Sequence, residues 1–119
     1  LILGSKDIYN FSLLYEEPNF ISLNKVQSHV ILEKNFLVSN LENKIVMIQS
    51  ADPGYDYLFS KKIGGLITQY GGANSHMAVR CAELGLPSVI GAGESNFKAW
   101  SKANVLEIDA KAKIVKIIS

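Results

Sequence analysis

The sequence lacks the features that mark several classes of protein. Its single cysteine, Cys81, excludes an internal disulfide and is consistent with a reducing cytoplasm. No apolar run approaches the roughly 18 residues of a membrane span, and nothing resembles a signal peptide. We therefore expect a cytoplasmic protein with no membrane partner.

An excess of charge of either sign is also missing. The 12 lysine and arginine residues nearly balance 11 acidic ones, and the net charge of +1 gives no reason to propose nucleic acid as a partner. Apolar residues make up 48% of the 119 residues, which argues against disorder and suits one globular α/β domain. The chain begins with leucine, so we expect it to be a fragment of a longer protein.

Apolar periodicity predicts alternating strands and helices. A helical pattern before Pro18 is either a helix packed on its own domain or a linker helix, so we divide the chain into 1–18 and a domain over 19–119. The order strand, helix, strand, helix, strand in the middle is a βαβαβ pattern, followed by a helix and a hairpin. We expect strands at 20–23, 30–32, 36–38, 44–49, 64–68, 87–90, 105–109 and 113–117, and helices at 1–17, 53–62, 75–84 and 94–102.

The stretch over residues 64–87 organises the chain. An apolar strand ending at Thr68 leads into a glycine-rich turn, and Asn74 or Ser75 is expected to cap a short helix. Gly85 is a natural helix terminator, and a proline follows it. His76 therefore falls in the first helical turn, beside backbone N–H groups without a partner.

This position suits phosphoryl chemistry. A helix start stabilises an anion and disfavours a protonated imidazole, so a neutral, nucleophilic His76 could accept and hold a phosphoryl group. The alternative is a helix-start histidine that is hydrogen-bonded to a loop carbonyl. We identify no second catalytic group that converges on His76, so an enzyme assembled wholly within this chain is the less favoured interpretation.

The motifs GGANSH at 71–76 and AELGLPSVIG at 82–91 resemble the phosphohistidine (mobile, or swivelling) domain of PEP-utilising enzymes such as phosphoenolpyruvate synthase and pyruvate phosphate dikinase. The likeness runs from about residue 44 to 118. It implies a swivelling β/β/α fold and a carrier in which His76 shuttles a phosphoryl group. It also implies partner domains elsewhere: an ATP-grasp kinase domain, and a domain that binds PEP or pyruvate. No cofactor or metal site is expected in this chain, and magnesium and ATP are expected on the partners.

Two departures from the family pattern concern the surroundings of the histidine. Asn74 replaces the usual threonine and Ala82 the usual arginine. Arg80 lies one turn after His76 and could contact the phosphoryl group instead, or it could simply pair with Glu83. These departures keep open a second hypothesis, a non-catalytic swivelling interaction module of the same fold. The candidate phosphoryl-stabilising residues are Gly72, Asn74, Ser75, Arg80 and Thr68.

Three further expectations concern residues outside this set. His29 has no acidic or cysteine partner at ligand spacing, so we interpret it as structural. Met77, Cys81 and Leu84 recur at helical spacing and are expected to point into the core. Cys81 is then a buried, unreactive thiol.

Overall fold

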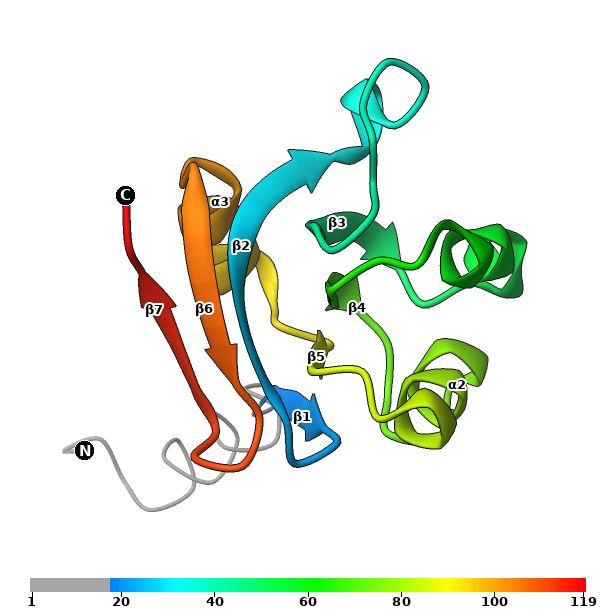
Figure 1. Ribbon diagram of the computed structural model, residues 1–119. Coiled ribbons are helices and arrows are strands. Elements are labelled where there is room, and N and C mark those ends of the chain that lie inside the picture. The colour runs from blue at the N-terminus through cyan, green and yellow to red at the C-terminus, as the bar shows by residue number, and fades with distance from the viewer. Residues whose placement is uncertain (1–17) are drawn as a thin grey trace, which may run out of the picture.

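The computed structural model describes residues 18–119 (Figure 1), so the helix expected over 1–17 lies outside the described residues. The described chain is a mixed α/β unit with a curled sheet and few helices. Its elements are β1 (Asn19–Ile21), β2 (Lys25–Leu32), the 3₁₀ helix η1 (Glu33–Asn35), β3 (Ile45–Ser50), the 3₁₀ helix η2 (Pro53–Lys61), β4 (Gly65–Tyr70), α2 (His76–Leu84), β5 (Ser88–Ile90), α3 (Glu94–Ser101), β6 (Val105–Asp109) and β7 (Ile114–Ile117).

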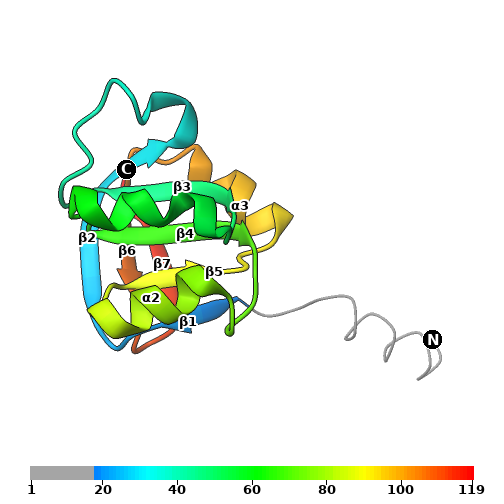
Figure 2. The same cartoon turned by 90° about the vertical axis from the view of Figure 1, so that its right-hand side faces the viewer.

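The predicted βαβαβ pattern is confirmed. Strands β3, β4 and β5 are neighbours and run parallel, with Val46 opposite Leu66 and Leu66 opposite Ser88. The connection from β3 to β4 is η2, and the connection from β4 to β5 is α2. Both connecting helices lie on the same face of these strands (Figure 2). The helix expected from residue 53 forms with a 3₁₀ rather than an α-helical hydrogen-bond pattern.

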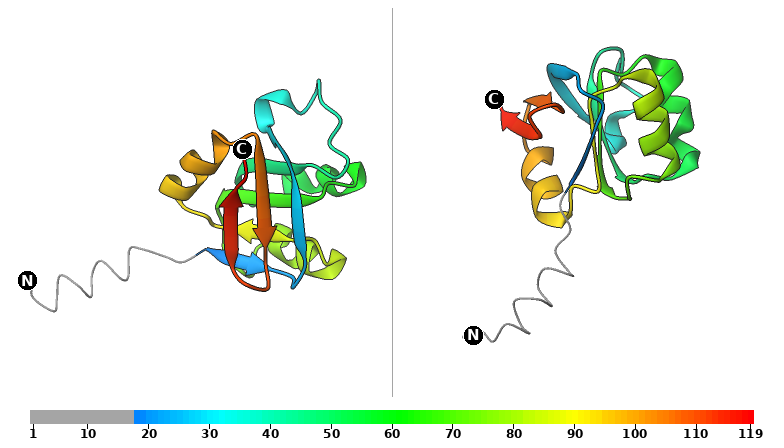
Figure 3. Two further views of the ribbon diagram at one scale, coloured as in Figure 1. Left: turned by 60° about the vertical axis from the view of Figure 1, so that its left-hand side comes forward. Right: turned by 90° about the horizontal axis from the view of Figure 1, so that it is seen from below.

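The strand order is β1-β5-β4-β3-β2-β6-β7, and the sheet curls at β2. The second half of β2 (Val30 to Leu32) pairs parallel with β3, whereas its first half (Lys25 to His29) pairs antiparallel with β6. Strand β2 therefore runs from the β6–β7 hairpin to the central strands, and it curves along this path (Figure 1). The β6–β7 hairpin, which the alternating sequence predicts, consequently lies on the other side of β3–β5 from η2 and α2 (Figure 3).

This arrangement gives two apolar clusters, one on each face of the central strands. Between those strands and the helices η2 and α2 lies a cluster that includes Leu58, Leu66, Met77, Cys81 and Ile90. The cluster on the other face is closed by the hairpin and by α3, whose Phe97 and Trp100 pack against it as their spacing predicts. No helix within residues 18–119 has the length and apolar character needed to cross a bilayer.

Two local predictions are wrong. The run 36–38 is not a strand: Phe36 is buried, but Leu37 and Val38 are exposed, because the chain turns there between η1 and β3. Leu84 is not a core residue either, since the residue is 56% exposed.

The turn at the end of α2 explains the second error. The Gly85 N–H donates to the Ala82 carbonyl and the Leu86 N–H to the Cys81 carbonyl, which is the Schellman arrangement. That turn folds Leu86 back onto the core, so Leu86 takes the place expected for Leu84.

Glycines bring the loops after β3, β4 and β5 into close contact. Gly71 has a φ of 134°, and a Cβ on it would lie 2.6 Å from the Cβ of Ala51. Gly91 has a φ of 75°, and a Cβ there would clash with the Gly71 carbonyl oxygen. The carboxyl ends of the parallel strands can meet in this way only without side chains at these two positions.

We expect Gly91→Ala to lower the free energy of unfolding by about 2 kcal/mol, because alanine would meet both an unfavourable φ and the Gly71 carbonyl. Gly72→Ala is the matched control: its φ is not positive, nothing lies within 4 Å of a Cβ there, and the change should stay under about 0.5 kcal/mol. Urea unfolding of the three chains measures the difference. Equal losses for both variants would contradict the close approach.

Candidate functional site

The candidate site lies at the edge of the sheet where β3 and β4 end and the helices η2 and α2 begin. The carboxyl edge of parallel strands is where α/β proteins commonly place ligands. The sequence fixes both helix starts. Asp52 caps η2 by accepting a hydrogen bond of 2.8 Å from the Gly54 N–H, with Pro53 in the first helical position as predicted.

The cap of helix α2 is Ser75, one of the two residues, Asn74 and Ser75, that the sequence offers for this role. The Ser75 hydroxyl oxygen accepts a hydrogen bond of 3.3 Å from the Ala78 N–H. The Ser75 N–H in turn donates to the Gly72 carbonyl at 3.0 Å, which holds the glycine-rich turn against the helix. His76 is therefore the first residue of α2.

The imidazole of His76 is accessible and has one acidic partner. Its side chain is 40% exposed, and it lies in the first helical turn, where the sequence places it. Its Nε2 lies 2.8 Å from Oδ1 of Asp56, which sits in the first turn of η2 and is itself 42% exposed. The alternative prediction, a hydrogen bond from His76 to a loop carbonyl, is not what the structure shows.

Arg80 completes a three-residue cluster. Its Nη1 lies 3.0 Å from Oδ1 and 3.1 Å from Oδ2 of Asp56, while its guanidinium carbon lies 5.0 Å from the centre of the Phe59 ring. Glu83, the partner expected from the sequence, is more distant, with its Oε1 at 3.8 Å from the arginine Nε. The expected Glu83 pair is thus present only as a long contact, and Asp56 is the main partner.

The electrostatic effect is clearest on Asp56. The hydrogen bond from His76 and the positive charge of Arg80 lower the pKa of this carboxyl below its ordinary value, against an opposing effect of desolvation. Asp56 is therefore an ionised carboxylate at neutral pH. It joins the first turn of η2 to the first two turns of α2.

Sequence reasoning missed Asp56. The signal was available, because the βαβαβ pattern places the starts of successive helices at one edge of the sheet. An acidic residue in the first turn of one helix and a histidine in the first turn of the next are then neighbours. The structure thus brings to His76 a carboxylate that the sequence analysis did not identify as its neighbour.

The remaining predicted site residues lie close by in the chain but differ in exposure. Gly72 and Asn74 are exposed in the turn before α2. Thr68 is fully buried; its hydroxyl donates to the Tyr70 carbonyl at 2.9 Å and accepts from the Gly91 N–H at 2.9 Å. A direct contact between Thr68 and a phosphoryl group would require the hydroxyl to leave these partners.

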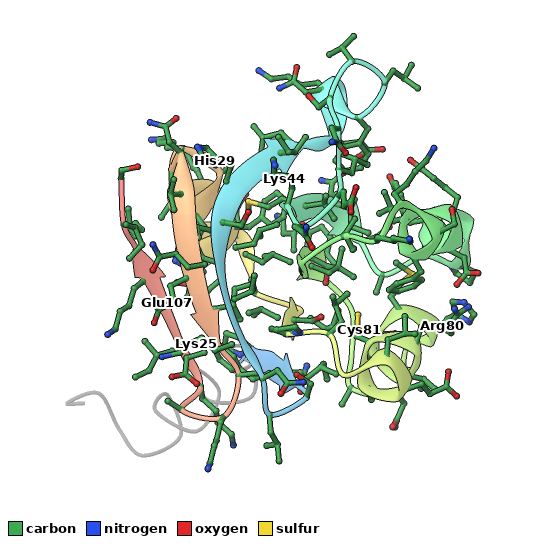
Figure 4. All side chains as sticks on the ribbon, in the orientation of Figure 1. Lys25, His29, Lys44, Arg80, Cys81 and Glu107 are labelled. Carbon is green, nitrogen blue, oxygen red and sulfur yellow. The ribbon has the colours of Figure 1, made fainter. Side chains whose placement is uncertain are left out.

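The two residues expected to be inert do not contribute to this cluster. Cys81 is buried under α2, and burial raises the pKa of its thiol to about 11, so it is not a reactive thiolate. His29 lies on β2, far from Arg80 (Figure 4), and faces Val105 across the strand pair. Within residues 18–119 no group of His, Cys, Asp and Glu side chains has the geometry of a metal site.

A second polar contact anchors η2. The Tyr55 hydroxyl donates a hydrogen bond of 2.7 Å to the Glu33 carboxylate, which ties the first turn of η2 to η1. This contact raises the pKa of Tyr55 to about 12. Because Tyr55 precedes Asp56 directly, the bond also restrains the backbone that presents Asp56 to His76.

Comparison with known proteins identifies the family. The model of the family described as "PEP-utilising enzyme, mobile domain" matches residues 40–113, which contain the whole His76–Asp56–Arg80 cluster. The chain belongs to this family.

Two curated relatives match parts of this mobile domain. Phosphoenolpyruvate synthase from Aquifex aeolicus is 35% identical over 57 residues, which are 48% of this chain and 6% of that protein. Rifampicin phosphotransferase from Bacillus cereus is 41% identical over 66 residues, which are 55% of this chain and 7% of that protein. The matches thus span only a small fraction of the length of these relatives.

The mobile domain also resembles a solved structure. A solution NMR structure of a UPF0107 protein superposes with a TM-score of 0.61, covering 87% of this chain and 98% of that one, at 11% sequence identity. At so low an identity the likeness concerns the fold alone.

We expect Glu33→Ala to return the pKa of Tyr55 from about 12 toward its ordinary value of 10.0. The pKa is raised in the folded state, so the bond contributes stability below pH 10 that is lost as the pH rises through about 12. Ultraviolet titration of the tyrosines measures this, with Tyr55→Phe identifying the late-titrating phenol. An unchanged titration in Glu33→Ala would show that the bond does not form in solution.

Proposed function

We propose that this chain is a phosphohistidine carrier domain in which His76 holds the phosphoryl group. The observation that carries the proposal is the position of His76. It is the first residue of a capped helix, its imidazole is 40% exposed, and Arg80 lies one turn further along the same helix. A phosphoryl group on this ring would lie near the N–H groups at the start of α2 and near the guanidinium of Arg80.

The proposed reaction needs partner domains. The names of the family and of both relatives refer to PEP-utilising or phosphotransferase chemistry, which supports PEP as one compound that exchanges the phosphoryl group with His76. The family resemblance implies ATP as the other. An ATP-grasp kinase domain with magnesium would serve one step, and a domain for PEP, pyruvate or another acceptor would serve the other. Within this chain the work is done by His76, which needs no cofactor to attack phosphorus.

The layered architecture supports a swivelling role. Two layers of strands and one of helices are packed through two apolar clusters, which is the arrangement expected of a β/β/α swivelling domain. The side chains of its candidate site are partly exposed, with His76 at 40% and Asp56 at 42%. Such a site suits a domain that presents a carried group to two different active sites in turn.

The first test is phosphoryl uptake. Incubated with its kinase partner domain and ATP, or with its PEP-binding partner and PEP, the chain should gain one phosphoryl group. The bond should be labile in acid and stable in alkali, as a phosphoramidate is. Mass spectrometry of the intact chain before and after acid treatment measures this.

Two histidine variants make that test specific. His76→Ala should abolish uptake while lowering stability by no more than about 1 kcal/mol, because its pair with Asp56 is solvent-exposed. His29→Ala, on the opposite part of the sheet, should take up phosphate like the parent. Uptake that persists in His76→Ala contradicts the assignment, and no uptake by the parent would favour the non-catalytic module.

A second test concerns Arg80. We expect Arg80→Gln to slow phosphoryl transfer roughly fivefold, the effect of about 1 kcal/mol from one partly exposed charge-assisted contact. Glu83→Gln is the control and should stay within about twofold of the parent, since its carboxylate is only loosely paired with Arg80. Single-turnover transfer rates from the kinase partner measure both. A rate for Arg80→Gln within twofold of the parent would show that Arg80 is only part of the solvated face.

A further inference from the structure

One carboxylate oxygen already occupies the space between the two groups that would hold a phosphoryl group. Oδ1 of Asp56 lies 2.8 Å from Nε2 of His76 and 3.0 Å from Nη1 of Arg80. A phosphoryl group on Nε2 would present anionic oxygens to the same region and compete for the same guanidinium. The site without phosphate is thus an anion-binding arrangement filled by an acidic side chain of the domain itself.

The pairing also determines which ring nitrogen carries the proton. An ionised carboxylate can only accept hydrogen bonds, so Nε2, which faces Asp56, must be the donor. In a neutral imidazole the lone pair is then on Nδ1. While Asp56 stays in place, Nε2 has no lone pair with which to attack phosphorus.

We propose that the Asp56 carboxylate occupies the place of the phosphoryl group in the unphosphorylated site. It must leave this place when His76 is phosphorylated on Nε2. This inference rests on the proposed carrier function and deepens it. The structure assigns Nε2 rather than Nδ1 because Nε2 shares an anion partner with Arg80. On displacement, the guanidinium exchanges its Asp56 partner for phosphoryl oxygens.

The transfer step is then as follows. Asp56 moves away, and the ring proton passes through water from Nε2 to Nδ1. The Nε2 lone pair attacks a phosphorus atom of the donor, a nucleoside triphosphate or an enol phosphate. A P–N bond forms, the P–O bond to the leaving group breaks, and the leaving oxygen keeps the electron pair. The Nδ1 proton is finally released to that oxygen or to water.

Asp56 therefore affects the two states of His76 in opposite directions. Its hydrogen bond stabilises the unphosphorylated ring. Phosphorylation is opposed because Asp56 must give up its bonds to His76 and Arg80, and because its negative charge stays on the neighbouring helix, close to the phosphoryl group. The consequence is a phosphoryl group that is harder to load and easier to pass on. For an exposed pair we expect an effect on the order of fivefold in the loading equilibrium.

The experiment uses the 119-residue chain with phosphoramidate as a small phosphoryl donor, so that no partner domain is needed. Asp56→Asn removes the charge while Asp52 keeps the cap of η2. The control is Glu107→Gln, which removes the same charge on β6, far from Arg80 (Figure 4). Phosphorus NMR gives the phosphorylated fraction and the nitrogen that carries the group, and nitrogen-15 NMR of the unphosphorylated chain gives the tautomer of His76.

We expect the parent His76 to carry its proton on Nε2 and to be phosphorylated on Nε2. Asp56→Asn should lose the tautomer bias and raise the phosphorylated fraction about fivefold, while Glu107→Gln matches the parent. Loading of Asp56→Asn at or below the level of Glu107→Gln overturns the inference, and so does phosphate on Nδ1 of the parent.

The two proposals fail in different ways. A parent chain that takes up no phosphate at His76 contradicts the carrier function. A parent His76 in the Nδ1–H tautomer contradicts the role of Asp56 by itself, whatever the result of the phosphorylation.

Discussion

The parallel pairing of β3, β4 and β5 is the constraint on which the rest of the structure depends. Parallel neighbours require a crossover after each strand, and crossovers of one hand return over the same face of the sheet. The helices η2 and α2 consequently start at one edge, side by side. Asp56 and His76, which are 20 positions apart in the chain, meet there as a result of strand direction rather than of any local motif.

Much of this arrangement could be predicted because its local signals agree with one another. The strands β3 and β4 are buried on both faces and appear in the sequence as continuous apolar runs, Ile45 to Ile48 and Leu66 to Ile67. Both ends of α2 are encoded by cap residues, Ser75 at the start and Gly85 at the end. These features placed His76 correctly at an exposed helix start.

The sequence could not supply what depends on packing between elements. Leu37 and Val38 resemble strand residues, and their exposure is decided by a turn that the sequence marks weakly. Asp52 and Asp56 both lie at the start of η2, and one caps the helix while the other faces α2. Residue type alone does not distinguish these two roles. The same limit applies to Arg80. Glu83 is the nearer acidic residue in the sequence, but Asp56 is the nearer one in the structure.

The shared strand β2 has a consequence for how the domain comes apart. Its first half is hydrogen-bonded to β6 of the hairpin layer (β6 and β7), and its second half to β3 of the central layer (β3, β4 and β5). Loss of β2 would therefore leave backbone groups of both layers without their partners. The two layers should therefore open as one cooperative unit, and their amide hydrogens should exchange with solvent by a common global event. The strands β3 and β4, whose ends form the edge that holds His76, belong to this cooperative unit. While the domain stays folded, the ends of β3 and β4 therefore keep the starts of η2 and α2 together at one edge.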